Sequence, residues 1–283
     1  MDTARLHDRP PSISIAALAR RIGTAAAPLV ADVRRAAAYE ADAQVIAGAL
    51  RILPDAVGAA LARLPKGRPI VVYCVHGHEV SQGAARDLVQ AGADACFLEG
   101  GIGAWREAGL PLMRKMPELG LPATPGKGTR WVTRERPKID RIACPWLIRR
   151  FLDPLAEFLY VPAAAVTAAA QREGATPYDV PGVRISHRGD AGERCSFDAL
   201  LDDSGIDDRC LADLACIVRG ADTGRCELTP ESAGLLAVSL GLSVNHADDH
   251  AMLDAGMVVY DALCAWLRAA RAEVHNADLF RKP

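Results

Sequence analysis

Cys74 is the residue whose place in the sequence points most directly to chemistry. It ends the apolar run at residues 69–74 and precedes a polar stretch, the place where an open α/β sheet presents its ligand site. The residues that follow it are Val75, His76, Gly77, His78, Glu79, Val80 and Ser81. Backbone N–H groups in such a turn can converge on one point, where their partial positive charge stabilises a thiolate or an oxyanion. The alternative is a buried structural cysteine, and spacing alone leaves both interpretations open.

Three side chains of this stretch could assist the thiol. An imidazolium at His76 or His78 would lower the pKa of Cys74, and His78 could protonate a leaving group. Glu79 is a weaker candidate for either role. Because exposed polar residues are the norm in loops, simple solvation is the competing interpretation for all three. The sequence therefore predicts a substrate-binding loop over residues 75–81 without assigning catalysis to any of its side chains.

The remaining cysteines give weaker signals. The eight cysteines stand at positions 74, 96, 144, 195, 210, 216, 226 and 264. The closest pair is six residues apart, so the chain has no CxxC motif for a structural zinc or a dithiol redox site. Most cysteines in such a chain are small buried hydrophobes, and we expect Cys96 and Cys144 to pack in the core.

Histidines and aspartates of the second half form a candidate metal site. His187, Asp222, Asp249 and His250 supply nitrogen and oxygen donors of the kind that divalent cations bind. We expect a divalent metal, where one binds, to be held by a subset of these four residues. The competing interpretation makes Asp248 a helix N-cap and His250 a residue of the first helical turn.

Residues 130–150 are strongly basic and could bind an anion. Arg134, Lys138 and Arg141 are the candidates, since guanidinium groups make forked hydrogen bonds to oxyanions. The alternative is a solvated basic face that pairs with the aspartate-rich stretch at residues 198–208.

Short apolar runs alternate with helical patterns over the first 115 residues. Runs with β-branched residues fall at 29–34, 69–74 and 95–98, as buried parallel strands require. Helical patterns fall at 55–64, with Asp55 as a candidate N-cap, and at 83–90, and a short helix is expected around Trp105. Residues 1–115 are therefore predicted to form an α/β domain, a parallel sheet flanked by helices.

Residues 116–128 are rich in proline and glycine and predict a linker. The remainder, 129–283, predicts a helix-rich α+β second domain. The expected helices fall at 145–151, 163–172, 211–219, 230–240 and 248–270, and the expected strands at 157–161 and 183–187. Pro145 is expected in the first turn of its helix, where its missing N–H has no partner to lose.

Composition bounds the class of protein. The 283 residues are 50% hydrophobic and 24% charged, with a formal net charge of −2, as in ordinary globular proteins. No apolar run approaches the roughly 18–20 residues needed to span a bilayer, and the first residues carry no secretory signal. We therefore expect a cytoplasmic protein without a membrane partner. The near-neutral charge and the lack of a helix-turn-helix pattern argue against a nucleic-acid partner.

Several motifs over residues 12–112 resemble a single-domain rhodanese. The loop that starts at Cys74 and the stretch 98–105 (LEGGIGAW) match the family's active-site loop and its closing Gly-Gly and Trp motif. Upstream, residues 30–34 (VADVR) and 46–49 (IAGA) are similar to its strand end and turn. The resemblance implies that Cys74 carries sulfur as a persulfide, braced by Asp32 and Arg34. It also implies a small sulfur donor, a thiol acceptor and no required cofactor in this domain.

The loop departs from many rhodaneses in one respect. The stretch from Cys74 to Ser81 reads as one residue longer than a six-residue loop, a length that resembles rhodanese-like phosphatases and arsenate reductases. Those phosphatases place an arginine six positions after the cysteine, where this chain has Val80, so phosphatase chemistry is disfavoured. Reduction of an oxyanion such as arsenate or chromate stays open as a third function, and it would need an electron donor and a resolving thiol.

The second half resembles the C-terminal domain of ChrB-type chromate-resistance proteins. Residues 130–151 (RWVTRERPKIDRIACPWLIRRF) are similar to its opening signature, and the resemblance continues at 186–189 (SHRG), 219–223 (RGADT) and 258–263 (VVYDAL). It implies a link to chromate or metal stress, with chromate or another oxyanion as a candidate ligand. The leading hypothesis is a sulfurtransferase at Cys74, and the alternative is a regulatory protein that binds or senses chromate or a metal.

Overall fold

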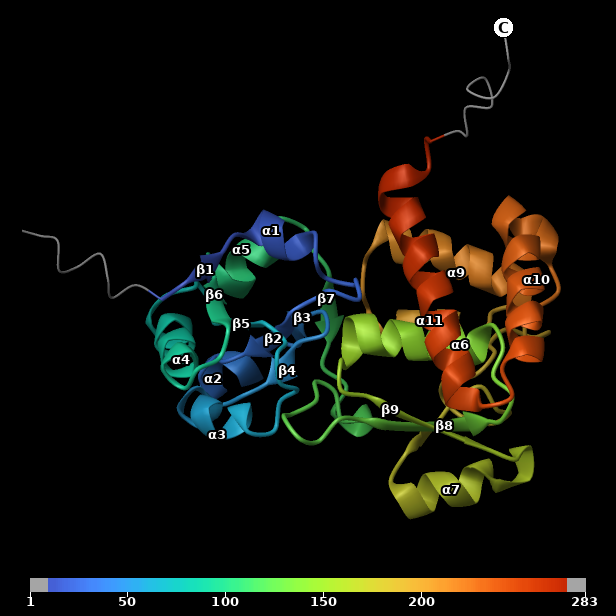
Figure 1. The fold of residues 1–283 in the computed structure, drawn as a ribbon, viewed down its shortest axis with the longest axis horizontal. Coiled ribbons are helices and arrows are strands. Elements are labelled where there is room, and N and C mark those ends of the chain that lie inside the picture. The colour runs from blue at the N-terminus through green and yellow to red at the C-terminus, as the bar shows by residue number, and fades with distance from the viewer. Residues whose placement is uncertain (1–9, 274–283) are drawn as a thin grey trace, which may run out of the picture.

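The N-terminal region of the computed structural model, which describes residues 10–273, is built on a parallel sheet. The strand order is β1-β6-β5-β2-β4, and every neighbouring pair runs parallel (Figure 1). The strands are β1 (Ser12–Ile13), β2 (Leu29–Asp32), β4 (Leu50–Arg51), β5 (Ile70–Tyr73) and β6 (Ala95–Leu98). The helices are α1 (Ile15–Ala19), α2 (Ala36–Glu40), α3 (Val57–Leu61), α4 (Glu79–Gln90) and α5 (Gly101–Glu107). The predicted parallel sheet flanked by helices is confirmed.

Both faces of this sheet are buried, which explains why its central strands are continuous apolar runs. One face packs against α3 and α4, where Val72 shares a core cluster with Leu88. The opposite face packs against α1 and α5, where Val71 shares a second cluster with Trp105. Because every residue of β2 and β5 is buried, the chain first becomes available for chemistry at the carboxyl ends of these strands.

Two helices of this region begin where the sequence did not place them. The pattern at 55–64 starts as a 3-10 turn, η1 (Pro54–Ala56), so Asp55 lies inside that turn and is not an N-cap. The helix after the cysteine loop begins at Glu79 and not at residue 83. Gly77 accounts for the early start, because its φ of +72° turns the chain and leaves His78 in the N-cap position.

The proline- and glycine-rich connection at residues 116–128 is packed against the rest of the protein. Just before it, β7 (Leu112–Arg114) pairs antiparallel with β3 (Gln44–Ile46). The backbones of Met116 and Leu121 form an isolated bridge, and both side chains are buried. Composition predicts the irregular backbone of this segment, whereas its anchoring comes from a few apolar side chains among the prolines and glycines.

The C-terminal region combines a small parallel sheet with helices, as predicted. The sheet has the order β10-β8-β9, with β8 (Arg130–Arg134), β9 (Glu157–Val161) and β10 (Thr176–Pro177). The helices are α6 (Asp140–Leu147), α7 (Val166–Glu173), α8 (Ser196–Ser204), α9 (Arg209–Asp222), α10 (Pro230–Asn245) and α11 (Asp249–Ala265) (Figure 1). Shorter helical turns are η2 (Pro117–Leu119), η3 (Ile148–Leu152), η4 (Ala163–Ala165), η5 (Cys226–Leu228) and η6 (Trp266–Ala270). Within residues 10–273 no helix is both long enough and apolar enough to cross a bilayer.

Helix α6 begins at Asp140, five residues before the expected start at Pro145. Pro145 therefore lies inside the helix, where it has no N–H to donate to the carbonyl of Arg141. The hydroxyl of Tyr178 donates to that carbonyl at 3.3 Å, and the Tyr160 hydroxyl approaches it at 3.5 Å. The two tyrosines supply the hydrogen bond that the proline removes, which is why the helix tolerates it.

Two further expectations for this region are corrected. Residues 183–187 form no strand, and Ile185 alone among them makes a bridge, to Tyr178. Helix α8 was not predicted, because its aspartates interrupt the apolar face that Phe197 and Leu200 present to the core.

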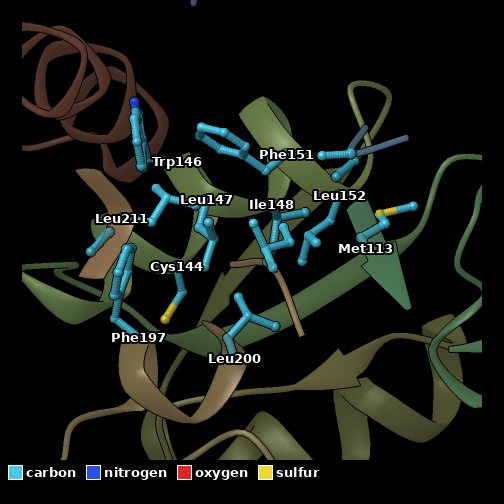
Figure 2. Packing of buried hydrophobic residues seen from close by; sticks show 14 of the residues in the cluster. Met113, Cys144, Trp146, Leu147, Ile148, Phe151, Leu152, Phe197, Leu200 and Leu211 are labelled. Carbon is cyan, nitrogen blue, oxygen red and sulfur yellow. The ribbon is translucent and has the colours of Figure 1, made fainter. Parts of the chain in front are cut away.

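The two regions share one hydrophobic core. Phe151 and Leu152, which follow α6, belong to the same buried cluster as Met113 of the N-terminal region (Figure 2). The Phe151 ring also packs so closely on Gly23 that a Cβ there would collide with it. Because this interface is apolar like a domain interior, we expect the two regions to move as one body.

Candidate functional site

Cys74 lies one residue beyond β5, at the carboxyl edge of the parallel sheet. Its side chain is 6% exposed. The Sγ atom lies 3.2 Å from the hydroxyl oxygen of Ser81. The backbone N–H groups of His76, His78 and Ser81 also donate to this sulfur. The turn after β5 therefore surrounds the thiol with hydrogen-bond donors, as the sequence leads one to expect.

These donors decide the charge of the thiol. Burial raises the pKa of Cys74, but the hydrogen bonds from the Ser81 hydroxyl and from the backbone outweigh burial and leave the pKa below its ordinary value. Cys96, on the neighbouring strand β6, shows the opposite balance, because burial and the charge of Asp94 raise its pKa to about 11. Cys96 is half-buried beside the core, in line with the packing role expected for it. Of these two cysteines, Cys74 is the one prepared to act as a nucleophile.

The tight shape of the loop depends on Gly77. Its φ of +72° lies in the left-handed region. A Cβ at this position would lie 2.6 Å from the carbonyl oxygen of Leu98 and 2.7 Å from the backbone nitrogen of Gly100. Any larger side chain would therefore push the loop away from the strand end that supports it.

The start of α5 holds the loop from the other side. The N–H of Ile102 donates to the carbonyl of Cys74, and the N–H of Gly103 donates to the carbonyl of Val75, each at 3.0 Å. A Cβ on Gly101 would collide with the backbone of the same loop. The paired glycines of the LEGGIGAW stretch are thus required by the close approach of two backbones.

Three of the predicted loop residues belong to a helix. Glu79, Val80 and Ser81 form the first turn of α4, and the loop itself covers residues 74–78. The expectation of a loop that reaches to Ser81 is therefore corrected. The left-handed backbone of Gly77 turns the chain, so the helix begins at Glu79. The helical start also turns the Ser81 hydroxyl back toward the Cys74 sulfur.

A pocket of about 560 Å³ opens beside Cys74. It is lined by Arg34, Arg35, Ala38, Cys74, Val75, His76, His78, Glu79, Val80 and Gln82. The rings of His76 and His78 are 6.0 Å apart between centroids, and both residues reach the sulfur through their backbone N–H groups. Val80 occupies the position of the phosphatase arginine, so that position supplies no charge to the pocket.

Asp32 and Arg34 form a buried ion pair at the end of β2. Their side chains are 0% and 1% exposed, and Arg34 Nη2 lies 2.6 Å from Asp32 Oδ2. Another nitrogen of the guanidinium donates to Asp42 at 2.7 Å, and the Tyr73 hydroxyl donates to Asp32 at 3.0 Å. The pair thus ties the end of β2 to the last residue of β5, which is the geometry that a bracing role requires.

Arg35 is a pocket residue that the sequence interpretation missed. It is exposed, stands at the N-cap of α2 and lines the pocket beside Cys74. The available signal was a second arginine directly after the strand end. A cation in this position attracts small anions to the pocket.

In the C-terminal region, two of the four proposed metal ligands meet. His187 Nε2 lies 3.0 Å from Asp222 Oδ2. Two carboxylates that were not predicted complete the cluster, with Asp140 at 3.7 Å and Asp179 at 3.6 Å from the same nitrogen. Donor atoms of Asp140, Asp179 and His187 all lie within 4.8 Å of one another. Asp140 stands inside the dense string at 130–151 and could have been singled out there.

The other two proposed ligands make different contacts. The carboxylate of Asp249 accepts a hydrogen bond from the backbone N–H of Arg136 at 3.0 Å. The ring of His250 packs edge-on against Tyr160, with 5.5 Å between centroids. Neither residue joins a group of three metal-binding side chains within residues 10–273. Asp248 is the N-cap of α11, as the competing interpretation expects, and the candidate ligand set is corrected to the residues around His187.

The charges of this cluster are crowded. Burial, together with the charges of Asp222 and Asp179, raises the pKa of Asp140 to about 8. The hydrogen bond to Asp222 raises the pKa of His187 to about 9 against the opposing effect of burial. Carboxylates held this close repel one another, so a positive charge among them is stabilising.

The candidate anion-binding residues are engaged in ion pairs. Arg134 and Arg141 lie 3.0 Å and 3.3 Å from the same oxygen of Asp179. Their partner is therefore not the aspartate-rich stretch at 198–208, and that alternative is corrected. Lys138 is half-buried, and its carbonyl accepts the N–H of Arg141 in the first turn of α6. One nitrogen of each arginine thus faces a carboxylate of the protein itself.

Comparison with known proteins finds a different family in each half. Residues 14–108 match a family described as rhodanese-like domain, and residues 131–267 match one described as ChrB, C-terminal domain. Protein ChrB from Cupriavidus metallidurans is 36% identical to the chain over 138 residues. That similarity covers 48% of this chain and 40% of the relative, so the chain spans less than half the length of that relative.

Two solved structures are similar to the N-terminal region. A rhodanese-related protein from Thermoplasma volcanium is 30% identical, with a TM-score of 0.32, over 36% of this chain and 96% of its own. A thiosulfate sulfurtransferase from Pseudomonas aeruginosa is 29% identical, with a TM-score of 0.31, over 37% of this chain and 19% of its own. Both likenesses are confined to little more than a third of the chain.

Proposed function

Since the chain joins a rhodanese-like domain to a ChrB C-terminal domain, we propose that it is a sulfurtransferase in which Cys74 holds the transferable sulfur as a persulfide. The observation that carries the proposal is the environment of Cys74, where donors hold the pKa of a nearly buried thiol below its ordinary value. A thiolate is the form of cysteine that attacks sulfur. Its position beside an open pocket gives a small donor access to it.

The reaction with thiosulfate needs two displacements at sulfur. The Cys74 thiolate attacks the outer sulfur of thiosulfate, the sulfur–sulfur bond of the donor breaks, and sulfite leaves with the electron pair. An acceptor thiolate then attacks the outer sulfur of the Cys74 persulfide and regenerates the Cys74 thiolate. The N–H groups around Sγ are placed to stabilise negative charge on the sulfur before and after each step.

The pocket favours a small sulfur donor over a phosphate ester. Arg35 places a positive charge at the edge of the pocket, which suits a small dianion. Bidentate clamping of a phosphate would call for a guanidinium where the chain has Val80. Oxyanion reduction at Cys74 would call for a resolving thiol, and no second cysteine is among the residues that line this pocket.

Thiocyanate formation from thiosulfate and cyanide by the full chain tests the proposal, with Cys74→Ser and Cys96→Ser as matched variants. We expect Cys74→Ser to lose the activity completely and Cys96→Ser to keep it within about twofold, because the Cys96 thiol lies outside the pocket. Mass spectrometry after thiosulfate treatment should find one added sulfur on Cys74. Full activity in Cys74→Ser, or no added sulfur on Cys74, would overturn the proposal.

The C-terminal domain suggests where this activity is used. Its match to ChrB links the chain to chromate resistance, and we propose that sulfur transfer serves the response to chromate or metal stress. The shared core of the two regions supports a joint role, since the halves are packed together.

A second candidate function is binding of a divalent cation in the C-terminal domain. The observation that favours it is the meeting of His187 with Asp140 and Asp179, whose donor atoms lie within 4.8 Å of one another. An imidazole nitrogen with carboxylate oxygens is a donor set that suits Zn²⁺. Asp140 and Asp179 are buried and His187 is exposed, so a cation bound here would be held on its protein side and open to solvent beside the imidazole.

Calorimetric titration of the full chain with Zn²⁺ tests this candidate. We expect His187→Ala to weaken binding at least about tenfold and His250→Ala to leave it unchanged, because only the first histidine joins the cluster. The melting temperature of each variant shows whether it is folded, and the conservative Asp140→Asn variant gives a second test. Equal affinity for Zn²⁺ in the parent, His187→Ala and Asp140→Asn proteins would exclude the site.

A further inference from the structure

Two cysteines that the sequence keeps far apart lie side by side in the C-terminal region. Cys210 is in the first turn of α9 and Cys264 is near the end of α11. Their Sγ atoms are 3.3 Å apart. Cys210 Sγ also lies 3.6 Å from the carbonyl oxygen of Cys264. A disulfide needs sulfurs about 2.05 Å apart, so closing this gap requires a movement of little more than an ångström.

The pair can be reached from solvent. Cys210 lines a pocket of about 610 Å³, and Cys264 lies directly behind it with 3% of its surface exposed. Residues 109–111 of the N-terminal region line the same pocket, together with Leu267, Arg268 and Arg271. Cys210 is therefore the sulfur nearer to solvent, and the sulfur of Cys264 lies within 3.3 Å of it.

The surroundings of the pair favour the loss of one proton. The hydrogen bond from Cys210 lowers the pKa of Cys264 against burial, and the charge of Arg268 lowers it further. The same hydrogen bond, with burial, raises the pKa of Cys210, so the two sulfurs share one proton when the first is lost. Arg268 lies 3.5 Å from Asp208, the N-cap of α9, and donates to the carbonyl of Ile22 in the N-terminal region at 2.9 Å.

We propose that Cys210 and Cys264 form a reversible disulfide when the protein meets a hydroperoxide. A thiolate of the pair attacks the peroxide oxygen, the O–O bond breaks, and a sulfenic acid forms with release of an alcohol, or of water from hydrogen peroxide. The second sulfur attacks the sulfenic sulfur, the S–O bond breaks, and water leaves. In sum, two thiols and one hydroperoxide give a disulfide, an alcohol or water, and a water molecule. The disulfide links α9 to α11 and is independent of sulfur transfer at Cys74.

Peptide mapping after treatment with one equivalent of hydrogen peroxide tests the proposal. Trypsin leaves Cys210 and Cys216 together in residues 210–219, and Cys226 and Cys264 together in residues 226–268. The experiment therefore uses a chain that carries Cys74→Ser, Cys216→Ser and Cys226→Ser, in which each of these peptides holds one cysteine. We expect the two peptides to be linked, the whole protein to lose two hydrogens in mass, and a thiol reductant to restore it.

Two further variants make the result specific. Adding Cys210→Ser to this background should abolish the linked peptides, whereas adding Cys96→Ser should leave them. In a chain that carries only Cys74→Ser, the same peroxide treatment should remove two free thiols and raise the melting temperature, because a crosslink restricts the unfolded chain. Oxygen addition at Cys210 without linkage, or a full thiol count in the Cys74→Ser chain, would overturn the proposal.

Discussion

Cys74 in the N-terminal half and the pair Cys144 and Cys195 in the C-terminal half lie in opposite environments. In the N-terminal half, N–H and O–H donors lower the pKa of Cys74 in spite of burial. In the C-terminal half, burial and then the charge of Asp140 raise the pKa values of Cys144 and Cys195. Cys74 is 6% exposed and the other two are 0% exposed, so burial alone does not separate the two cases. Hydrogen-bond donors outweigh the effect of burial at Cys74, whereas carboxylate charges add to it at Cys144 and Cys195.

The backbone explains how each environment arises. Cys144 lies within α6, where the amide groups nearby are used by the helix itself, and the charged neighbours that reach it are carboxylates. Cys74 lies in a turn between a strand and a helix, where several N–H groups have no partner in regular structure. A thiol at a turn can therefore be activated by backbone alone, whereas a thiol in a helix depends on side chains nearby.

Alkylation should show the largest difference between the halves. We expect iodoacetamide to modify Cys74 of the folded protein at pH 7 at least about 100-fold faster than Cys144 or Cys195, since only the thiolate reacts. Cys74 lines a pocket, whereas Cys144 and Cys195 are fully buried. Because its pKa is lowered, the rate at Cys74 should level off below pH 9, the ordinary pKa of the thiol. Mass spectrometry of tryptic peptides measures each rate. The difference should vanish in denaturant, and equal rates in the folded protein would contradict the comparison.

Gly77→Ala should distort the turn whose N–H groups donate to Cys74, without changing the cysteine itself. The added Cβ would lie 2.6 Å from the Leu98 carbonyl oxygen, so the loop must shift and its N–H groups leave Cys74. We expect thiocyanate formation to fall about 100-fold or more, in the range found when positioned donors are lost. Gly83→Ala in α4 is the matched control, because nothing lies within 4 Å of its added Cβ. That variant should keep its activity and gain about 0.5–1 kcal/mol of stability. Equal activity in both variants would mean that the turn is dispensable.

Sequence predicts the site of the first half well because that site is local. Strand β5 and the turn after it place Cys74 and its donors within residues 70–81, and an apolar run followed by a polar turn is visible in the chain. The start of α4 was harder to predict, because it depends on the left-handed backbone of one residue, Gly77.

The cluster of the second half is not local, and sequence predicts only part of it. His187 and Asp222 were singled out, but adjacency in the chain favoured Asp249 and His250 over Asp140 and Asp179. Packing brings Asp140, at the start of α6, against the backbone N–H of Phe197 in α8, 3.1 Å away, and so places its carboxylate near His187. No spacing rule links residues that meet only because three helices pack together. The contact between Cys210 and Cys264 could not be predicted for the same reason, because it depends on the packing of α9 against α11.

Ser81→Ala should show how much one donor contributes. The Ser81 hydroxyl is the largest favourable hydrogen bond to Cys74, and a hydrogen bond to a charged group contributes about 1.5–3 kcal/mol. Losing it should raise the pKa of Cys74 by about one to two units, because 1.36 kcal/mol corresponds to one unit. Below both pKa values the alkylation rate of Cys74 should fall about 10- to 100-fold, and at alkaline pH the two proteins should converge. Ser81→Thr, which keeps a hydroxyl, is the control, and a uniform loss at every pH would point to a misplaced loop.

His78→Ala should have the smallest effect. It separates the contribution of the His78 backbone N–H from that of its imidazole. His78 donates to the Cys74 sulfur through its backbone N–H, which alanine also has, and its side chain makes no N-capping hydrogen bond. We therefore expect the pH of half-maximal alkylation rate at Cys74 to shift by less than about half a unit. The rate of thiocyanate formation should change by less than about threefold. The alternative is that the imidazole acts as a proton donor or as a charge beside the thiolate. In that case His78→Ala would lose most of its activity, and His76→Ala serves as the comparison because the two side chains line the same pocket. A small, pH-independent effect in both variants means that backbone amides carry the activation, as the opposite behaviour of Cys144 implies.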